Sequence, residues 1–316
     1  MDKIINFTNC KRAHVTYGGT DRKFGVIYND EVYLLKFSKK HAKRTDISTS
    51  YVNNAISEYI SSHIAQSTGL LVHETVLGTF EDEIVVGCKD FRNRNDSTNI
   101  EFSEYVRAKY DSSEIKRFIM LNQIYDTLQD PKNEIPKTLQ KASVERYWDT
   151  FVIDALVGNF NRNTDNWGFI FENNQLKLAP IYGFGSSLFP EISDDGAELL
   201  LNNKTEMAKK CLVFPSPSLS IANGKVGYYD MMSSNYDSNC TKAVLRMTPR
   251  INIEKINDIV DNTPFISDIR KAFYKDILSL RNEMIVTQSY VKCQLNEFDN
   301  DAKERLQTGH QFFEKN

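Results

Sequence analysis

The chain has 316 residues, of which 41% are hydrophobic, and a formal net charge of −3 at pH 7. This length allows one large two-lobed domain or two ordinary ones with a proper core, and the near-neutral charge argues against direct nucleic-acid binding. No apolar run is long enough to span a bilayer, so no membrane partner is expected. The N-terminus lacks a signal-peptide pattern, and the five cysteines are scattered without metal-site spacing. We therefore predict a cytoplasmic protein with reduced thiols.

The first 90 residues predict mainly β-structure. Pairs of short β-rich runs predict two hairpins, residues 24–28 with 32–37 and residues 75–80 with 84–88. Short polar links separate the runs of each pair, as is typical of tight turns. Between the hairpins, apolar residues recur at helical spacing over 52–64, and Gly69 follows as a stop.

After residue 92 the pattern becomes mainly helical. Residues 101–129 form a long helix-prone segment, and an apolar helical stripe over 144–156 ends at Gly158. The remaining predicted elements are a short hairpin, 167–171 with 176–179, and helices over 253–260 and 266–286.

The order of these elements is that of a two-lobed kinase, although generic α+β folds share it. We therefore predict an α+β, bilobal protein-kinase-like fold. Its β-rich N-lobe covers residues 1–92, its mainly helical C-lobe covers 93–298, and a polar tail covers 299–316.

Three features of the N-lobe suit phosphate binding. Gly18 and Gly19 allow backbone amides to approach phosphate oxygens, and Lys23 follows them; an ordinary glycine turn is the alternative. Lys36 ends an apolar strand, where its ammonium faces either nucleotide phosphates or water at a sheet edge. Glu58 lies on the flank of the predicted helix, where it forms a half-buried pair with Lys36 or is an ordinary exposed glutamate.

The C-lobe contains a segment with the layout of a kinase catalytic loop. Residues 158–169 read GNFNRNTDNWGF and place Asn161 where a catalytic aspartate is expected. One short hairpin later, residues 178–190 read LAPIYGFGSSLFP. Kinases hold a magnesium-binding aspartate in this second segment, and here the position is Gly183.

Together these segments resemble the HipA-like serine/threonine kinase family, in its short, CtkA-type form. The resemblance covers residues 15–290 and is specific. It is carried by the motifs YLLKF at 33–37, SEY at 57–59, VVGCKDF at 85–91, YWD at 147–149, GNF at 158–160, NWGF at 166–169, PRI at 249–251 and IVDNTPF at 259–265.

The resemblance implies transfer of the ATP γ-phosphate to serine or threonine hydroxyls of a protein. It implies that Lys36 binds phosphates, that Glu58 holds Lys36, and that Asn166 binds magnesium. Family substrates include translation components, and some members are toxins, so an antitoxin or an active kinase is a candidate partner. The residues expected to contact ATP are Gly18, Gly19, Lys23, Lys36, Cys88, Lys89 and Phe91.

Three positions depart from the family pattern: Asn161 replaces the general-base aspartate, Asn163 replaces a histidine, and Gly183 replaces the magnesium aspartate. A neutral amide can hydrogen-bond a hydroxyl but cannot accept its proton, and a general base contributes ~10²–10⁴-fold in rate. Glycine supplies no carboxylate to a hard cation. Asp165, beside Asn166, is the best-placed substitute ligand, with capping of a turn as the alternative.

We therefore expect a kinase fold with impaired catalysis. The alternative is an inactive pseudokinase that acts as a binding or regulatory partner. Transfer of AMP is a third interpretation, but it also needs metal ligands. Natural divergence and engineered inactivation both account for the replacements, and the sequence Gly183-Phe184-Gly185 favours divergence.

Overall fold

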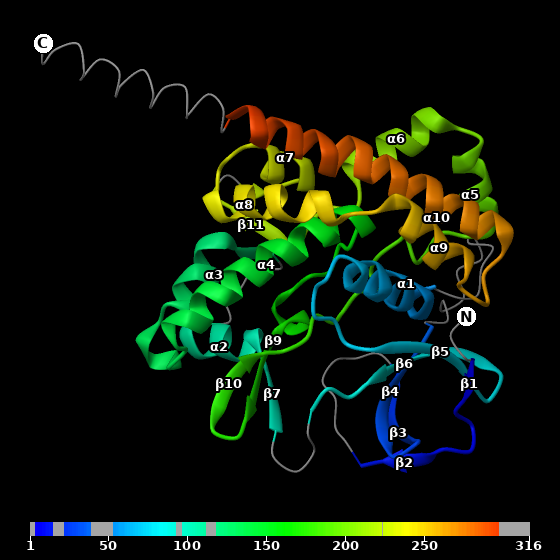
Figure 1. The fold of residues 1–316 in the computed structure, drawn as a ribbon, viewed down its shortest axis with the longest axis horizontal. Coiled ribbons are helices and arrows are strands. Elements are labelled where there is room, and N and C mark those ends of the chain that lie inside the picture. Colours follow the sequence, from blue (N-terminus) through cyan, green and yellow to red (C-terminus); the bar gives the residue numbers. More distant parts are fainter. Residues whose placement is uncertain are drawn as a thin grey trace, which may run out of the picture.

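A six-stranded β-sheet and a mass of helices form the two halves of the molecule (Figure 1). The computed structural model describes residues 4–14, 22–38, 53–92, 97–111, 118–222 and 224–296. Gly18, Gly19 and the predicted tail over 299–316 lie outside these residues. A β-rich N-terminal half and a helical C-terminal half are the predicted arrangement.

The N-terminal sheet has the strand order β1-β5-β6-β4-β3-β2. Its hairpin turns have left-handed backbone, with φ of 49° and 62° at Asn29 and Asp30 and 47° and 62° at Glu81 and Asp82. Two-residue turns of this kind match the twist of antiparallel strands, so both predicted hairpins are confirmed. The strands are β1 Ile5–Asn6, β2 Lys11–Ala13, β3 Lys23–Tyr28, β4 Glu31–Phe37, β5 Thr75–Phe80 and β6 Glu83–Lys89.

The alternation of side chains along β4 separates a packed face from a cleft face. Leu35 and Phe37 are buried in a small core that also contains Phe80. Leu34 and Lys36 point to the opposite face and line the cleft between the two halves. Because side chains alternate along a strand, the burial of Leu35 and Phe37 in the core directs Lys36 to the cleft.

Helix α1, Asn54–Ser67, lies between the sheet and the helical half (Figure 1). Ile56, Ile60 and Ile64 are buried in the large core, which continues from this helix into the C-terminal helices. The helix ends as predicted, because Gly69 follows it with φ of +86°. The two halves thus share one continuous core on the α1 side.

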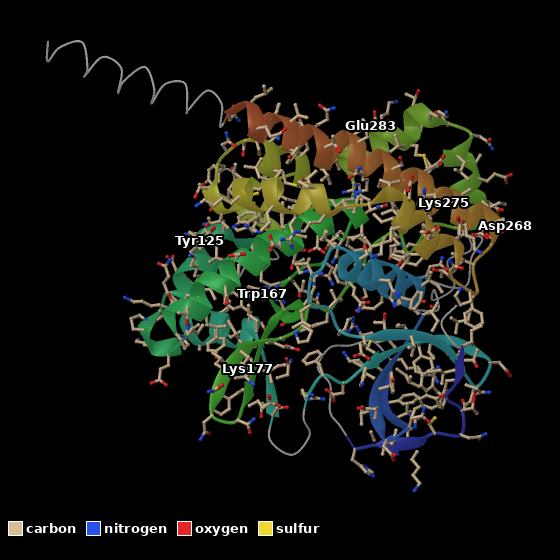
Figure 2. All side chains as sticks on the ribbon, in the orientation of Figure 1. Tyr125, Trp167, Lys177, Asp268, Lys275 and Glu283 are labelled. Carbon is tan, nitrogen blue, oxygen red and sulfur yellow. The ribbon has the colours of Figure 1, made fainter. Side chains whose placement is uncertain are left out.

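The helical half is built around α4, Lys137–Val157, whose C-terminal end is almost wholly buried. Trp167 stacks on Phe102 at 4.0 Å between ring centroids, whereas Lys177 and Glu283 lie on the outer surface (Figure 2). In the part of the chain that the structure describes, no helix is both long and apolar enough to cross a membrane. The other helices are α2 Phe102–Lys109, α3 Leu121–Leu128, α5 Asp194–Leu201, α6 Lys204–Val213, α7 Tyr228–Ser233, α8 Ser238–Met247, α9 Ile253–Asp261 and α10 Asp268–Arg281, which a π-helix over Asn282–Thr287 continues.

Two small three-stranded sheets complete this half, and one of them corrects the sequence analysis. The segment 101–129 is not one helix, because β8, Ile119–Met120, interrupts it and pairs in parallel with β11, Leu219–Ile221. A distant strand therefore overrides local helix propensity. The predicted hairpin is β9, Gly168–Glu172, with β10, Gln175–Leu178, and β7, Ser97–Glu101, joins it as an unpredicted third strand. The remaining strand is β12, Gly224–Lys225.

Candidate active site

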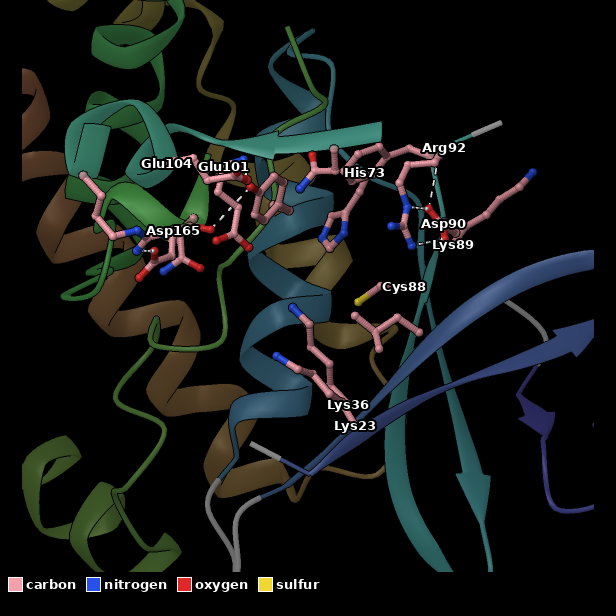
Figure 3. Close-up of a pocket in the computed structure, with 16 residues that line it drawn as sticks. Lys23, Lys36, His73, Cys88, Lys89, Asp90, Arg92, Glu101, Glu104 and Asp165 are labelled. Atoms are coloured by element: carbon pink, nitrogen blue, oxygen red, sulfur yellow. Dashed lines mark hydrogen bonds and ion pairs between the residues drawn. The ribbon is translucent and has the colours of Figure 1, made fainter. Parts of the chain in front are cut away.

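A cavity of about 700 Å³ lies between the sheet and the loop that follows α4 (Figure 3). This volume is within the range of ~300–1,000 Å³ that is typical of small-molecule sites. Glu58, Asn161 and Gly183 lie close to the cavity but outside its wall. The wall contains seven residues that the sequence analysis associates with nucleotide or metal: Lys23, Lys36, Cys88, Lys89, Phe91, Asp165 and Asn166.

An ion pair joins the sheet to α1 at the back of the cavity. Lys36 Nζ lies 3.2 Å from Glu58 Oε1, and the Lys36 side chain is 29% exposed while that of Glu58 is 3% exposed. The same Glu58 oxygen accepts a hydrogen bond from the Gly183 N–H at 3.1 Å. Burial opposes both charges, but their mutual attraction outweighs it, so the pKa of Glu58 is lowered and the pKa of Lys36 is raised. Both groups therefore stay charged at neutral pH.

His73 is a third partner of this carboxylate, and the sequence analysis did not single it out. Its Nε2 lies 3.2 Å from Glu58 Oε1 and 3.2 Å from Ser62 Oγ. Burial lowers the pKa of His73 despite the nearby carboxylate, so the ring is neutral and Nε2–H donates to Glu58. No spacing rule marks this residue, because only the packing of the segment after α1 brings it to the helix.

Replacing His73 with glutamine is expected to reduce the loss of stability at acid pH. The pKa of folded His73 is below its ordinary value of 6.5, so below pH 6.5 the unfolded chain binds a proton that the folded chain resists. This histidine therefore destabilises the fold progressively as the pH falls through that window, by about 1 kcal/mol between pH 7.5 and 5.5.

Urea unfolding at pH 7.5 and 5.5 measures the effect. The stability difference between the two pH values should be about 1 kcal/mol smaller in His73→Gln than in the wild type. His63→Gln, which removes the histidine on α1, is the matched control. An equal pH dependence in the wild type and His73→Gln would rule out this role.

A buried ion pair shapes the loop after α4. Helix α4 ends at Gly158, which has φ of +66° and turns the chain toward the cavity. Arg162 donates from Nε to Asp154 Oδ2 at 2.8 Å and from a terminal nitrogen to Asp154 Oδ1 at 3.0 Å. Arg162 also donates to the backbone carbonyls of Asn166, at 2.8 Å, and Tyr182. Attraction to Asp154 outweighs the burial that opposes the charge, so the pKa of Arg162 is raised.

Asn161, at the expected base position, is exposed at the mouth of this loop. Its side-chain oxygen accepts a hydrogen bond from Asn163 Nδ2 at 3.3 Å, and its backbone carbonyl accepts one from Asn166 Nδ2 at 2.6 Å. Asp165 lies 3.5 Å from Arg107 on the wall of the cavity, with both side chains about half exposed. Such exposed pairs contribute only ~0–1 kcal/mol.

The residues around Gly183 do not fit the magnesium site that the resemblance implies. Gly183 offers no ligand, and a Cβ placed on it would lie 2.7 Å from Asn166 Oδ1. The Asn166 side chain therefore occupies the space that an aspartate at 183 would need, while Asp165 faces Arg107. Magnesium is usually held by one or two carboxylates together with phosphates and waters.

One group of metal-ligand types does come together among the described residues, namely Glu58, His73 and Cys88, whose ligand atoms lie within 4.8 Å of one another. Glu58 is already paired with Lys36 there. Burial raises the pKa of Cys88 to about 12, so this thiol stays protonated and is a poor ligand. The Glu58 carboxylate of this group therefore binds the Lys36 ammonium rather than a metal ion.

The expected adenine contacts lie where β6 leaves the sheet. Phe91 stacks on Tyr182 with 5.9 Å between ring centroids and 27° between planes, and Leu34 and Cys88 add apolar surface to the cavity. Tyr182 directly precedes Gly183 and was not predicted as a site residue. Acidic residues that the sequence analysis also missed, Glu101 and Glu104, line the opposite wall.

A lysine–glutamate pair on a β-rich half, facing a shaped loop on a helical half across one cleft, defines a two-lobed kinase fold. The family model of the HipA-like C-terminal domain matches residues 15–259. The chain belongs to this HipA-like family.

Known relatives agree with this assignment. The serine/threonine-protein kinase CtkA of Helicobacter pylori strain J99 is 35% identical over 297 residues, which are 92% of this chain and 88% of CtkA. The crystal structure of the H. pylori proinflammatory kinase CtkA has a TM-score of 0.84 at 33% identity, covering 92% of this chain and 98% of that one. A chain from the Shewanella oneidensis MR-1 complex of HipA, HipB and operator DNA has a TM-score of 0.53 at 14% identity, covering 89% of this chain and 67% of that one, and shows the fold alone. The bilobal kinase-like fold and the CtkA-type resemblance are thereby confirmed.

Proposed function

We propose that this HipA-like, CtkA-like protein binds ATP in the cleft and transfers its γ-phosphate to a protein hydroxyl only at a strongly reduced rate. The observation that carries the proposal is the ionised Lys36–Glu58 pair at the back of the cavity. Lys36 contacts phosphate oxygens while Glu58, held by His73 and the Gly183 N–H, keeps the ammonium in place. Leu34, Cys88 and Phe91 supply the apolar surface for the base.

The reduced rate follows from the loop. Asn161 hydrogen-bonds a substrate hydroxyl but leaves its proton in place, which costs ~10²–10⁴-fold relative to a general base. Neither Gly183 nor Asn166 supplies a carboxylate, so no step is assigned to magnesium. A protein substrate and a toxin-type role with an antitoxin partner are part of the proposal. They rest on the protein-kinase activity named for CtkA and on membership of the HipA-like family.

A pseudokinase that acts through a partner is the alternative function. The Asn166 side chain favours it, because it occupies the space beside Gly183 that a metal-binding carboxylate would need. The two functions share nucleotide binding but differ in product: the first predicts slow labelling of a protein hydroxyl, and the second predicts none.

Lys36→Met tests the shared step. The variant keeps an apolar stem of similar size and removes the ammonium, so we expect ATP affinity in magnesium buffer to fall by about tenfold or more, since a hydrogen bond to a charged group contributes ~1.5–3 kcal/mol. Isothermal titration calorimetry measures the affinity, and circular dichroism checks the fold. Lys177→Met, which removes an exposed lysine on β10, is the matched control. Unchanged ATP affinity in Lys36→Met would refute binding at this cleft.

A further inference from the structure

Two lysines lie directly opposite each other on neighbouring strands at the cavity. Lys23 of β3 pairs in register with Lys36 of β4. Both side chains line the cavity, and Figure 3 shows them extending into it in the same direction. Two ammonium groups side by side on one wall, one of them held in place by Glu58, form a surface suited to a polyanion.

Acidic side chains around the cavity lie behind or across from the lysine pair. Glu58, on α1 at the back of the cavity, already accepts from Lys36, His73 and the Gly183 N–H. Glu101 lies on the opposite wall, close enough to Lys23 for the ammonium to stabilise the charged form of its carboxyl group. The cavity therefore has a positive wall on the sheet side and an acidic wall on the loop side.

The positive wall can replace the charge that a metal usually provides. In kinases, magnesium neutralises the phosphates and links them to aspartate. Here the residues around Gly183 do not fit that ion, whereas two ammonium groups converge on one side. A polyphosphate on the sheet side would contact both lysines, with Glu101 and Asp165 on the other wall.

We propose that the Lys23–Lys36 pair binds the polyphosphate of a nucleotide without a divalent cation. This inference rests on the proposed nucleotide binding and adds to it the form of the ligand, the metal-free nucleoside triphosphate, and the role of Lys23, which the sequence predicts only as an ATP contact. Lys23 supplies the charge-assisted contact that a metal bridge supplies in a catalytic kinase.

Calorimetric titration of the full chain tests the proposal with three probes: ATP in EDTA, ATP in magnesium chloride, and adenosine. We expect the wild type to bind ATP in EDTA within about threefold of its affinity in magnesium. Lys23→Gln should weaken ATP binding in EDTA by about tenfold, which corresponds to one charge-assisted contact. The same variant should bind adenosine as the wild type does, which shows that the base site is intact.

Lys11→Gln is the matched control, because it removes the same charge from an exposed position on the neighbouring strand β2. It should leave all three affinities unchanged. ATP binding that requires magnesium, or equal affinities for Lys23→Gln and Lys11→Gln, would overturn the inference while nucleotide binding stands. Absence of binding for all three probes would overturn the proposed function as well.

Discussion

Restoring both aspartates, Asn161→Asp together with Gly183→Asp, is expected to raise phosphoryl transfer by about 10²–10⁴-fold. The carboxylate at 161 accepts the hydroxyl proton that the present amide cannot take. The carboxylate at 183 provides the ligand that the cavity lacks beside Asn166. Transfer of radiolabel from ATP in magnesium buffer, to the chain itself and to an added hydroxyl-bearing protein, measures the gain.

The restoration carries a local structural cost at 183. Gly183 has φ of +83°, a conformation that aspartate tolerates better than most side chains, but its Cβ requires Asn166 to move. That movement breaks the 2.6 Å hydrogen bond from Asn166 Nδ2 to the Asn161 carbonyl. We therefore expect the double variant to be less stable than the wild type by about 1–3 kcal/mol.

Asn161→Asp with Gly183→Asn is the matched control, because asparagine has the size of aspartate without its charge. It should show the same loss of stability and no gain beyond that of Asn161→Asp alone. A folded double-aspartate variant that binds ATP yet labels nothing would exclude impaired catalysis as the only defect and favour the pseudokinase function.

Local pattern was sufficient for the elements that carry the site. The apolar run over 32–37 predicted the strand that carries Lys36, and the helical spacing over 52–64 predicted the helix that carries Glu58 on the flank of its apolar stripe. Gly158 marked the end of α4 because glycine adopts the left-handed conformation there at little cost. These features depend on neighbours in sequence, which a pattern can report.

Features set by distant contacts were not predictable. His73 reaches Glu58 from a segment with no periodic signal, and Asn166 meets Gly183 only after β9 and β10 fold back. The helix expected over 101–129 is interrupted because β11, about a hundred residues away, pairs with β8. The pairing of Asp154 with Arg162 was likewise missed, since a charge within an apolar stripe gives no hint of its partner.

That buried pair gives the largest expected effect on stability. Asp154 is fully buried, and the Arg162 side chain is 6% exposed. Asp154→Asn leaves the guanidinium charged and without its carboxylate, which typically costs ~3–5 kcal/mol. Urea unfolding measures the loss. ATP binding should also weaken, because Arg162 holds the carbonyls of Asn166 and Tyr182 beside the cavity.

Asp261→Asn is the control that tests whether the stability loss depends on burial or on the loss of any ion pair. Asp261 pairs with Lys275 at 2.8 Å, the same distance as between Arg162 and Asp154, but its side chain is 50% exposed and that of Lys275 is 34% exposed. Solvent screening limits such a pair to ~0–1 kcal/mol. Similar losses in Asp154→Asn and Asp261→Asn would contradict a structural role for the buried charge. A loss confined to Asp154→Asn, reduced when Arg162→Met is added, would identify the unpaired guanidinium as its cause.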